Sequence, residues 1–456
     1  MTDKQQVIII GAGIAGLAAA RVLQRAGISC TVLEARDRGG GRLVNEPIAG
    51  DQIVELGGQW IGPGQDEMYK LVDELGLQTF PTYNEGHHLL EFRGKRSRLA
   101  PHKGAIPRLS PFALLDILQA RNRFEKMAAR VPLHAPWEAH KARQWDGQTW
   151  ESWIQRNLRT PAGKIYFRLV CEAVFSAETT DMSLLHALFY VRSGADLDTL
   201  ISVDQGAQQD RIVGGTQLIC QRMAESLGAA LVLEQAVSRI VQHAQGVEVH
   251  TPTQTFHGTY VLCTLPPTLA GRLVYDPPLP GYRDQLTQRL PAGSVIKFAA
   301  VYERPFWREQ GHTGQYVCTE GPVKITFDNS PPSGTPGVMM GFMEANDGRQ
   351  MSLLPPEERQ ARVIQRLTHF WGPQAANPLQ YVEKDWMADP WARGCYGAHF
   401  TPGVWTAYGP ALREPVGRIH WAGAETATVW NGYMEGALRA ATQTAELLIE
   451  KMKNSS

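Results

Sequence analysis

A glycine-rich turn near the start of the chain constrains its fold more than any other feature. Residues 7–10 form a continuous apolar run that suits a strand buried on both faces, and a turn from Gly11 to Gly16 follows directly. A helical pattern then runs to about residue 26, and a second apolar run, Cys30–Leu33, ends at Glu34. This order predicts a strand–helix–strand unit within a parallel sheet.

The glycine spacing in this turn, Gly-x-Gly-x-x-Gly, is typical of a dinucleotide site. Gly11 allows the tight turn, Gly13 lets a pyrophosphate approach the backbone, and Gly16 lets the helix pack closely on the strand. The start of the helix offers N–H groups and a positive dipole end to the phosphates. Glu34 lies where a ribose-binding acid is expected. The motif serves both NAD and FAD, so other features have to identify the dinucleotide.

Further glycine-rich segments lie after Glu34 and near the C-terminus. Residues 38–42 (RGGGR) combine glycines with two flanking arginines, which suits a second approach to a pyrophosphate, and a further glycine pair lies within residues 56–60 (LGGQW). Residues 421–426 (WAGAET) and 431–436 (NGYMEG) predict a strand, a loop and a helix start, a second place for anionic cofactor atoms. The cofactor motifs therefore fall in three separated parts of the chain.

The composition argues against several classes of function. Lys plus Arg equals Asp plus Glu, 45 each, so the net charge of zero gives no reason to expect a nucleic-acid partner. The six cysteines include no CxxC and no close Cys/His pair, so no metal is expected. No run of about eighteen apolar residues occurs, and no signal-peptide pattern is seen. We therefore expect a cytoplasmic protein without a membrane anchor.

Eight segments of the chain carry a family resemblance. They are VIIIGAGIAGLAAA (7–20), VLEARDRGGGR (32–42), ELGGQWIGPGQ (55–65), VGG (213–215), SVIKFAAVYERPFW (294–307), DWMADPWARGCYGAHFTPG (385–403), IHWAGAETA (419–427) and NGYMEGALRAA (431–441). In this order they resemble the flavin amine oxidase family, and most closely the monoamine oxidases. One departure is Gly39, where the family usually has an aliphatic residue. The resemblance implies FAD as the cofactor.

The fold implied by this resemblance is α/β (α+β) with two domains. A Rossmann-like FAD-binding domain, similar to those of glutathione reductase and p-hydroxybenzoate hydroxylase, would be formed by residues 1–80, 210–285 and 391–453. A substrate domain of a mixed sheet and helices would be formed by the inserted residues 81–209 and 286–390. Residues 454–456 would be a tail. A homodimer is compatible with the sequence, which does not decide the oligomeric state.

By the same resemblance, residues along the chain would contact FAD. Glu34 and Arg36 would hold the adenosine ribose, and Arg42 the pyrophosphate. The backbone of Val237 would meet the adenine, and Glu425 the ribityl chain. The other residues expected at the cofactor are Gly11, Gly13, Ile14, Ala15, Gly16, Ala35, Gly41, Gly57, Gly58, Gln59, Trp60, Cys395, Tyr396, Gly423, Ala424, Gly432, Tyr433 and Met434.

Lys297 interrupts an apolar run at residues 295–301. Strand alternation places its side chain on the same face as Val295, Ala299 and Val301. Because burying an ammonium among apolar groups is costly, the pattern alone favours a lysine at a solvated edge. The family, however, has a lysine here that holds a water against flavin N5. The resemblance therefore predicts a catalytic role for Lys297.

Tyr396 and Tyr433 would form, by the resemblance, an aromatic cage in front of the flavin. Two electron-rich ring faces favour an amine head and orient it, although each residue alone would pass for a core tyrosine. Trp386, in the family's tryptophan position, would pack near the flavin and Lys297. Cys395 stands where membrane-bound monoamine oxidases carry a thioether to the flavin. A covalent link and a free buried thiol both stay open.

The implied substrate pocket is largely apolar, which suits a hydrophobic amine tail. Trp60 stands where L-amino-acid oxidases of this fold carry an arginine for the substrate carboxylate, so an amine without a carboxylate is favoured. A diamine oxidase would need an acidic group far down the pocket, and none can be placed. The residues expected to line the pocket are Trp60, Ala173, Ile201, Gln208, Ile325 and Phe342.

The chain is thus predicted to be an FAD-dependent monoamine oxidase. It would oxidise a hydrophobic primary amine to an imine, which hydrolyses to an aldehyde or ketone and ammonia, while dioxygen becomes hydrogen peroxide. Alternative substrates are diamines, polyamines or L-amino acids. A desaturase or porphyrinogen oxidase of the same fold and a flavin-binding protein without turnover also stay open.

Overall fold

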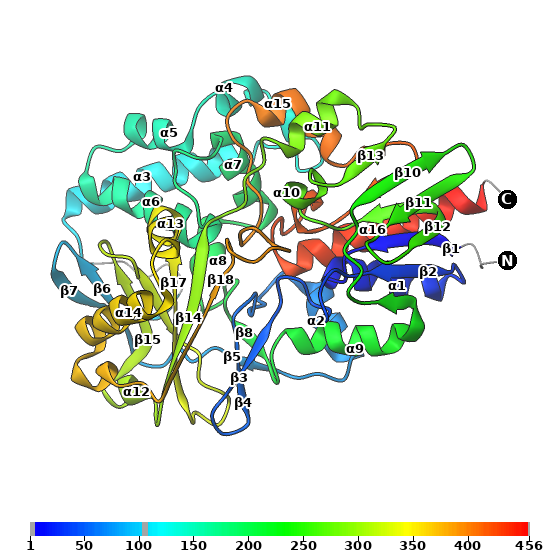
Figure 1. Cartoon of the computed structure of the whole chain (residues 1–456). Coiled ribbons are helices and arrows are strands. Elements are labelled where there is room, and N and C mark those ends of the chain that lie inside the picture. The colour runs from blue at the N-terminus through cyan, green and yellow to red at the C-terminus, as the bar shows by residue number, and fades with distance from the viewer. Residues whose placement is uncertain (1–4, 103–107, 455–456) are drawn as a thin grey trace.

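The computed structural model describes residues 5–102 and 108–454, with two large sheets at opposite ends of the molecule (Figure 1). Residues 455 and 456 of the expected tail lie outside the described residues. The strands are β1 (Gln5–Ile10), β2 (Cys30–Leu33), β3 (Asn45–Ile48), β4 (Gln52–Glu55), β5 (Thr79–Pro81), β6 (His87–Phe92), β7 (Lys95–Leu99), β8 (Asp210–Ile212), β9 (Leu231–Val232), β10 (Arg239–His243), β11 (Gly246–His250), β12 (Thr255–Cys263), β13 (Val274–Asp276), β14 (Val295–Tyr302), β15 (His312–Cys318), β16 (Ile325–Asp328), β17 (Gly337–Glu344), β18 (Gln380–Asp385) and β19 (Ile419–Trp421). The α-helices are α1 (Ile14–Arg25), α2 (Asp66–Glu74), α3 (Pro111–Ala128), α4 (Ala142–Asp146), α5 (Trp150–Asn157), α6 (Pro161–Phe175), α7 (Leu184–Ser193), α8 (Leu197–Ile201), α9 (Gln217–Leu227), α10 (Pro267–Ala270), α11 (Gly281–Thr287), α12 (Phe306–Glu309), α13 (Ala345–Ser352), α14 (Pro356–Trp371), α15 (Val404–Tyr408) and α16 (Met434–Lys453).

The first sheet contains the predicted strand–helix–strand unit. Its strand order is β13-β10-β11-β12-β1-β2-β9, and β19 pairs in parallel with the end of β12. β1 runs parallel to both of its neighbours, β12 and β2. Val7 and Ile9 of β1 pack in the same cluster as α1, whereas Ile8 and Ile10 pack on the opposite face. The continuous apolar run is thus buried on both sides, as predicted.

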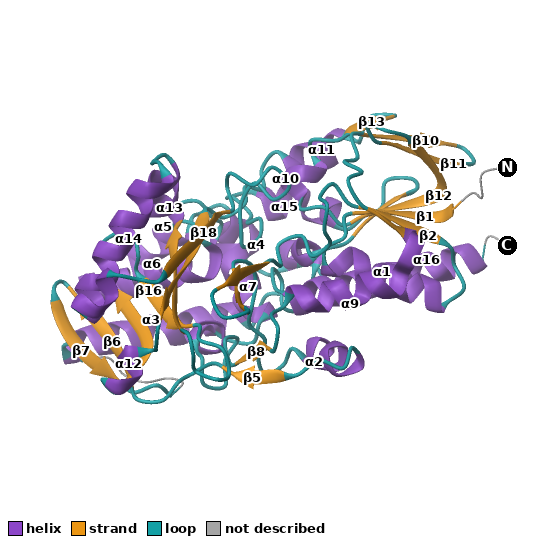
Figure 2. Cartoon of the chain, turned by 60° about the horizontal axis from the view of Figure 1, so that its bottom comes forward, coloured by secondary structure: helices purple, strands orange, loops and turns teal. Residues whose placement is uncertain are grey.

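Helices α1, α9 and α16 cover one face of this sheet. Figure 2 shows them together below the fan of β12, β1 and β2, and α1 packs against both of the others. The buried residues of α16, among them Ala437, Ala441 and Leu448, recur at helical spacing. Because β1 and β19 are both parallel to β12, the segments that follow them, which lead into α1 and α16, leave the same edge of the sheet.

The second sheet has the order β18-β14-β17-β16-β15-β6-β7. Ile296 and Phe298 of β14 pack in a cluster with α14 on one face. Alternation turns Lys297 to the other face, where Phe342 of the neighbouring strand β17 also lies. This second face lines the cavity described below.

Helices α3 to α8 form a separate layer that packs around buried aromatic rings such as Phe124, Trp150 and Phe167. They supply helices expected in the inserted segments. All strands of the first sheet come from the segments predicted to form the FAD-binding domain. All strands of the second sheet come from the segments predicted to form the substrate domain. The exact domain boundaries stay a prediction. Within the described residues, no helix combines the length and apolar character needed to cross a bilayer.

Candidate active site

One cavity of about 740 Å³ lies between the two sheets, a size at the upper part of the range of about 300–1,000 Å³ that ligand pockets occupy. Its walls include the loops after β1 and β2 at one end, and residues of β14, β16 and β17 at the other. Nearly all residues predicted to bind cofactor or substrate line it. The exceptions are Gly16, Trp386 and Glu425.

The glycine turn has the shape that a pyrophosphate requires. Gly11 has a φ of +99°, a backbone conformation that side chains rarely adopt. A Cβ on Gly16 would lie 1.9 Å from the carbonyl oxygen of Gly11, so only glycine fits between α1 and the turn. A Cβ on Gly13 would meet no described atom within 4 Å, because this residue faces the cavity. No described side chain caps α1, so its first N–H groups suit phosphate.

Glu34 is buried at the end of β2 with its carboxylate aimed at the turn. Its Oε2 accepts a hydrogen bond from the Ala12 N–H at 2.8 Å, and its Oε1 accepts one from the Arg36 N–H at 3.0 Å. The Arg36 guanidinium pairs with Asp389 at 2.7 Å. Because a carboxylate oxygen has more than one acceptor position, Glu34 can still bind ribose hydroxyls. Asp389, which holds Arg36, was not among the predicted residues.

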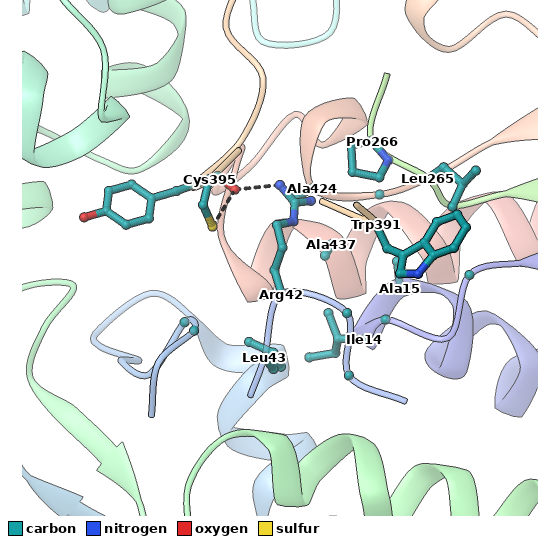
Figure 3. Close-up of a pocket in the computed structure, with 18 of the residues that line it drawn as sticks. Ile14, Ala15, Arg42, Leu43, Leu265, Pro266, Trp391, Cys395, Ala424 and Ala437 are labelled. Atoms are coloured by element: carbon teal, nitrogen blue, oxygen red, sulfur yellow. Dashed lines mark hydrogen bonds between the residues drawn. The ribbon is translucent and has the colours of Figure 1, made fainter. Parts of the chain in front are cut away.

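Arg42 lies in the cavity wall beside Cys395 and Ala424 (Figure 3). It donates to the backbone oxygen of Tyr396 at 2.6 Å and to Glu425 at 2.7 Å. Burial opposes its charge, but Glu425 raises the pKa of Arg42 above its ordinary value. Glu425 is not among the residues that line the cavity, and its expected contact with a ribityl chain stays a prediction. A permanently charged arginine facing the cavity fits a pyrophosphate.

Lys297 is only 3% exposed, so the alternative of a solvated edge is wrong. Its Nζ donates to the backbone oxygen of Gly57 at 2.8 Å and to the side-chain oxygen of Gln59. Gln59 in turn donates to Asn329 at 2.7 Å, which fixes the orientation of its amide. Burial lowers the pKa of Lys297 to about 7. An ammonium has three donors, so one remains for a water in the cavity.

Tyr396 and Tyr433 come from separate segments and line the same cavity. The Tyr396 hydroxyl donates to Glu344 at 2.8 Å. The Tyr433 ring lies between two aromatic neighbours, with its centre 6.0 Å from that of Tyr190 and 5.0 Å from that of Trp430. Burial raises the pKa of both tyrosines, so each presents a neutral phenol. Their predicted role as a cage stays a prediction.

Trp386 and Cys395 occupy different layers of the site. Trp386 is buried behind the cavity wall, where its Nε1 donates to the backbone oxygen of Leu56 at 2.8 Å. Cys395 lines the cavity, as Figure 3 shows, and burial raises the pKa of its thiol to about 12. Yellow colour that stays with acid-precipitated protein would demonstrate a thioether, and colourless protein a free thiol.

The predicted substrate-pocket residues all line the cavity. The ring centre of Trp60 lies 5.0 Å from that of Phe327 and 6.4 Å from that of Phe342, so aromatic faces form much of this end. The Gln208 side chain donates to the backbone oxygen of Leu200 at 3.0 Å, and its Oε1 has no partner among the described residues. The remaining predicted lining residues are Ala173, Ile201 and Ile325.

Glu344 supplies an acidic group in the cavity wall, whereas the sequence alone does not allow one to be placed in the pocket. It is the last residue of β17, is 5% exposed, and lines the cavity beside Tyr396. Strand alternation offered the signal, because Glu344 lies two residues after Phe342 and therefore on the same face. Phe342 is among the residues predicted to line the pocket, and Glu344 is not.

The comparisons with known proteins agree with this geometry. A family model described as flavin containing amine oxidoreductase matches residues 14–449. The chain belongs to this family. The fold expected from the sequence is therefore confirmed, the cofactor is FAD, and the protein is an amine-oxidising enzyme.

This flavin amine oxidoreductase has relatives that match it over nearly its whole length. It is 42% identical to the protein named flavin-containing monoamine oxidase AofH in Mycobacterium tuberculosis, over 97% of both chains. It is 36% identical to the flavin-containing amine oxidase B of Homo sapiens, over 99% of this chain and 87% of that protein. Cyclohexylamine oxidase from Brevibacterium oxydans superposes with a TM-score of 0.94 at 31% identity, covering 99% and 100%. Putrescine oxidase bound to putrescine superposes with a TM-score of 0.92 at 32% identity, covering 98% and 99%.

Proposed function

We propose that this enzyme oxidises a hydrophobic primary amine to an imine, which hydrolyses to an aldehyde or ketone and ammonia, while dioxygen is reduced to hydrogen peroxide. One observation carries the proposal: a single cavity joins the phosphate-binding turn to Lys297 and two tyrosines. The named relatives support it, because they are monoamine, cyclohexylamine and putrescine oxidases.

The chain's own residues position the reactants. Gly13, Glu34 and Arg42 would hold the phosphate and ribose groups of FAD, which when bound accepts a hydride from the carbon next to the amine nitrogen and passes electrons to dioxygen. Tyr396 and Tyr433 would orient the amine, and Lys297 would hold a water at its third N–H position. The apolar walls would exclude bulk water from the reacting carbon.

An amine without a carboxylate fits the cavity better than an L-amino acid. The arginines of the cavity wall are Arg36, Arg42 and Arg272, and they lie toward the dinucleotide end, where Arg36 and Arg42 already pair with acids. At the other end Trp60 offers no charge, and Lys297 already directs two of its N–H groups to Gly57 and Gln59. Burying an unpaired carboxylate costs roughly several kcal/mol of binding free energy.

Oxidation of a diamine is a second candidate, because Glu344 places an acid in the cavity wall and putrescine oxidase has a similar structure. The relatives are named amine oxidases, which favours amine oxidation over a desaturase, a porphyrinogen oxidase or a flavin protein without turnover. The cytoplasmic location and the homodimer stay predictions.

In the absence of oxygen, we expect hydrophobic amines to reduce the bound flavin and so bleach its colour, and we expect an L-amino acid not to do so. Cyclohexylamine, benzylamine and phenylethylamine should reduce it, and air should restore the colour with release of hydrogen peroxide, since the apolar walls stabilise their tails. The matching L-phenylalanine should leave the colour unchanged. Stopped-flow absorbance across this panel is the measurement. Flavin that no amine bleaches would overturn the proposal, and bleaching by L-phenylalanine would overturn its substrate class.

A further inference from the structure

The carboxyl group of Glu344 lies in the cavity wall without a role in the mechanism above. Its Oε1 accepts hydrogen bonds from the Tyr396 hydroxyl at 2.8 Å and from the Ser176 hydroxyl at 3.4 Å. No donor to Oε2 is found among residues 5–102 and 108–454. One oxygen is therefore anchored to a predicted cage tyrosine, and the other is free to meet a ligand in the cavity.

The neighbouring charges leave this carboxyl without a cation of its own. Lys324 lies nearby, but its ammonium binds Glu172 at 2.6 Å and Asp347 at 2.8 Å. Burial raises the pKa of Glu344 to about 8; Glu172 adds to this, while the Tyr396 hydrogen bond and Lys324 oppose it. Other charged groups on elements packed against Glu344 include Lys297 on the paired strand β14, Arg349 on α13, which pairs with Asp181, and Glu178, which accepts a hydrogen bond from the backbone of Asn346.

Amine oxidation requires that a proton be removed from the substrate nitrogen. A simple alkylamine resembles the lysine side chain, whose pKa is about 10.4, so it reaches the enzyme as an ammonium ion. An ammonium has no lone pair to support hydride loss from the adjacent carbon. Burying it in an apolar cavity is also costly unless the charge is neutralised. The proton must therefore leave the nitrogen before the hydride is transferred.

We propose that the Glu344 carboxylate accepts this proton at Oε2 and so converts the incoming ammonium to the neutral amine beside Tyr396. This inference rests on the proposed amine oxidation. An N–H bond of the substrate breaks and an O–H bond of Glu344 forms, with no electron transferred to the protein. The proton returns to water when the product leaves, which restores the carboxylate.

The site geometry favours Glu344 over the other polar groups at this end of the cavity. Lys297 already directs two of its N–H groups to Gly57 and Gln59. Burial keeps the phenols of Tyr396 and Tyr433 protonated. A carboxylate within hydrogen-bond reach of a cage tyrosine thus remains as the acceptor.

Glu344→Gln tests the proposal, because glutamine keeps the acceptor for the Tyr396 hydroxyl but cannot take up a proton. With phenylethylamine, kcat/KM of the natural enzyme should level off by about pH 8, matching the pKa of Glu344. The variant should continue to rise until the free amine itself is neutral, near pH 10. At pH 7.5 we expect a loss of about 100-fold, which shrinks to about threefold or less at pH 10.

Three comparisons separate proton transfer from a structural effect. A β,β-difluorinated phenylethylamine, whose two electron-withdrawing fluorines lower the amine pKa far below that of phenylethylamine, is largely neutral at pH 7.5, so Glu344→Gln should oxidise it at close to the natural rate. Glu344→Asp retains a carboxylate and should keep the natural profile shape. Asp347→Asn, a matched change at the neighbouring acid that binds Lys324, should leave the profile unchanged. Flavin absorbance and thermal unfolding check that each variant is folded and loaded.

Several outcomes would overturn the inference. A loss of equal size at every pH, or for the fluorinated amine as well, would show that Glu344 only positions Tyr396. A loss confined to diamines would show that it binds a second ammonium group. If no amine reduces the flavin of the unchanged enzyme, the proposed function itself fails.

Discussion

Lys297→Met is expected to lower the rate of turnover by about 100-fold, the size of effect seen when one preorganised donor is removed from an active site. Methionine matches the length and volume of lysine but has no N–H groups. It would release the Gly57 oxygen and the Gln59 amide, and with them the water that Lys297 is proposed to hold. Stopped-flow absorbance measures flavin reduction by an amine and reoxidation by dioxygen separately.

The control is Lys70→Met, whose lysine is exposed on α2 and pairs with Glu67 there. It should oxidise amines as the unchanged enzyme does. If Lys297→Met kept both half-reactions at their natural rates with full flavin content, the assignment of Lys297 to the chemistry would be excluded. If it lost FAD, the lysine would act instead through the loop that carries Gly57.

Gly16→Ala is expected to abolish recovery of the FAD-loaded enzyme. The new Cβ would lie 1.9 Å from the Gly11 carbonyl oxygen, which is a backbone atom and cannot rotate away as a side chain can. Relief requires α1 to move off the turn, at a cost of about 3 kcal/mol or more. Flavin absorbance per protein and the midpoint of thermal unfolding measure the two losses.

Two other glycines provide matched controls for this change. A Cβ on Gly281 meets no described atom within 4 Å and its φ is ordinary, so Gly281→Ala should behave as the natural protein. Gly13→Ala also finds open space in the protein, but that space is the proposed phosphate site. It should fold normally and bind FAD more weakly. A Gly16→Ala enzyme with full flavin and natural stability would contradict the close packing of α1 on the turn.

Strand alternation in β14 and β17 predicts which side chains share a face of the sheet. It placed Lys297 on one face of β14 with Val295, and the structure confirms that this face lies away from the cluster containing Ile296 and Phe298. It did not indicate whether that face meets water or the interior. Only the position of the second sheet against the first decides that Lys297 is buried and that Glu344 lines a cavity.

The contact between Arg42 and Glu425 is a second feature that the sequence does not predict. These residues are 383 positions apart in the chain. They form a salt bridge because the loop between β2 and β3 contacts the segment between β19 and α16 in the folded protein. Resemblance assigned each residue to the cofactor separately. In the folded chain the two residues also form an ion pair, in which the Glu425 carboxylate stabilises the positive charge of Arg42.

The sequence by itself determined the strand–helix–strand unit, its phosphate-binding turn and the family, because these depend on residues close together in the chain and on ordered motifs. The tertiary structure alone decided which polar groups are desolvated together, namely Lys297 with Gln59, and Glu344 with Tyr396. The physical reason is that burial and hydrogen bonding between distant segments set the charge of a side chain, and spacing along the chain does not encode that distance.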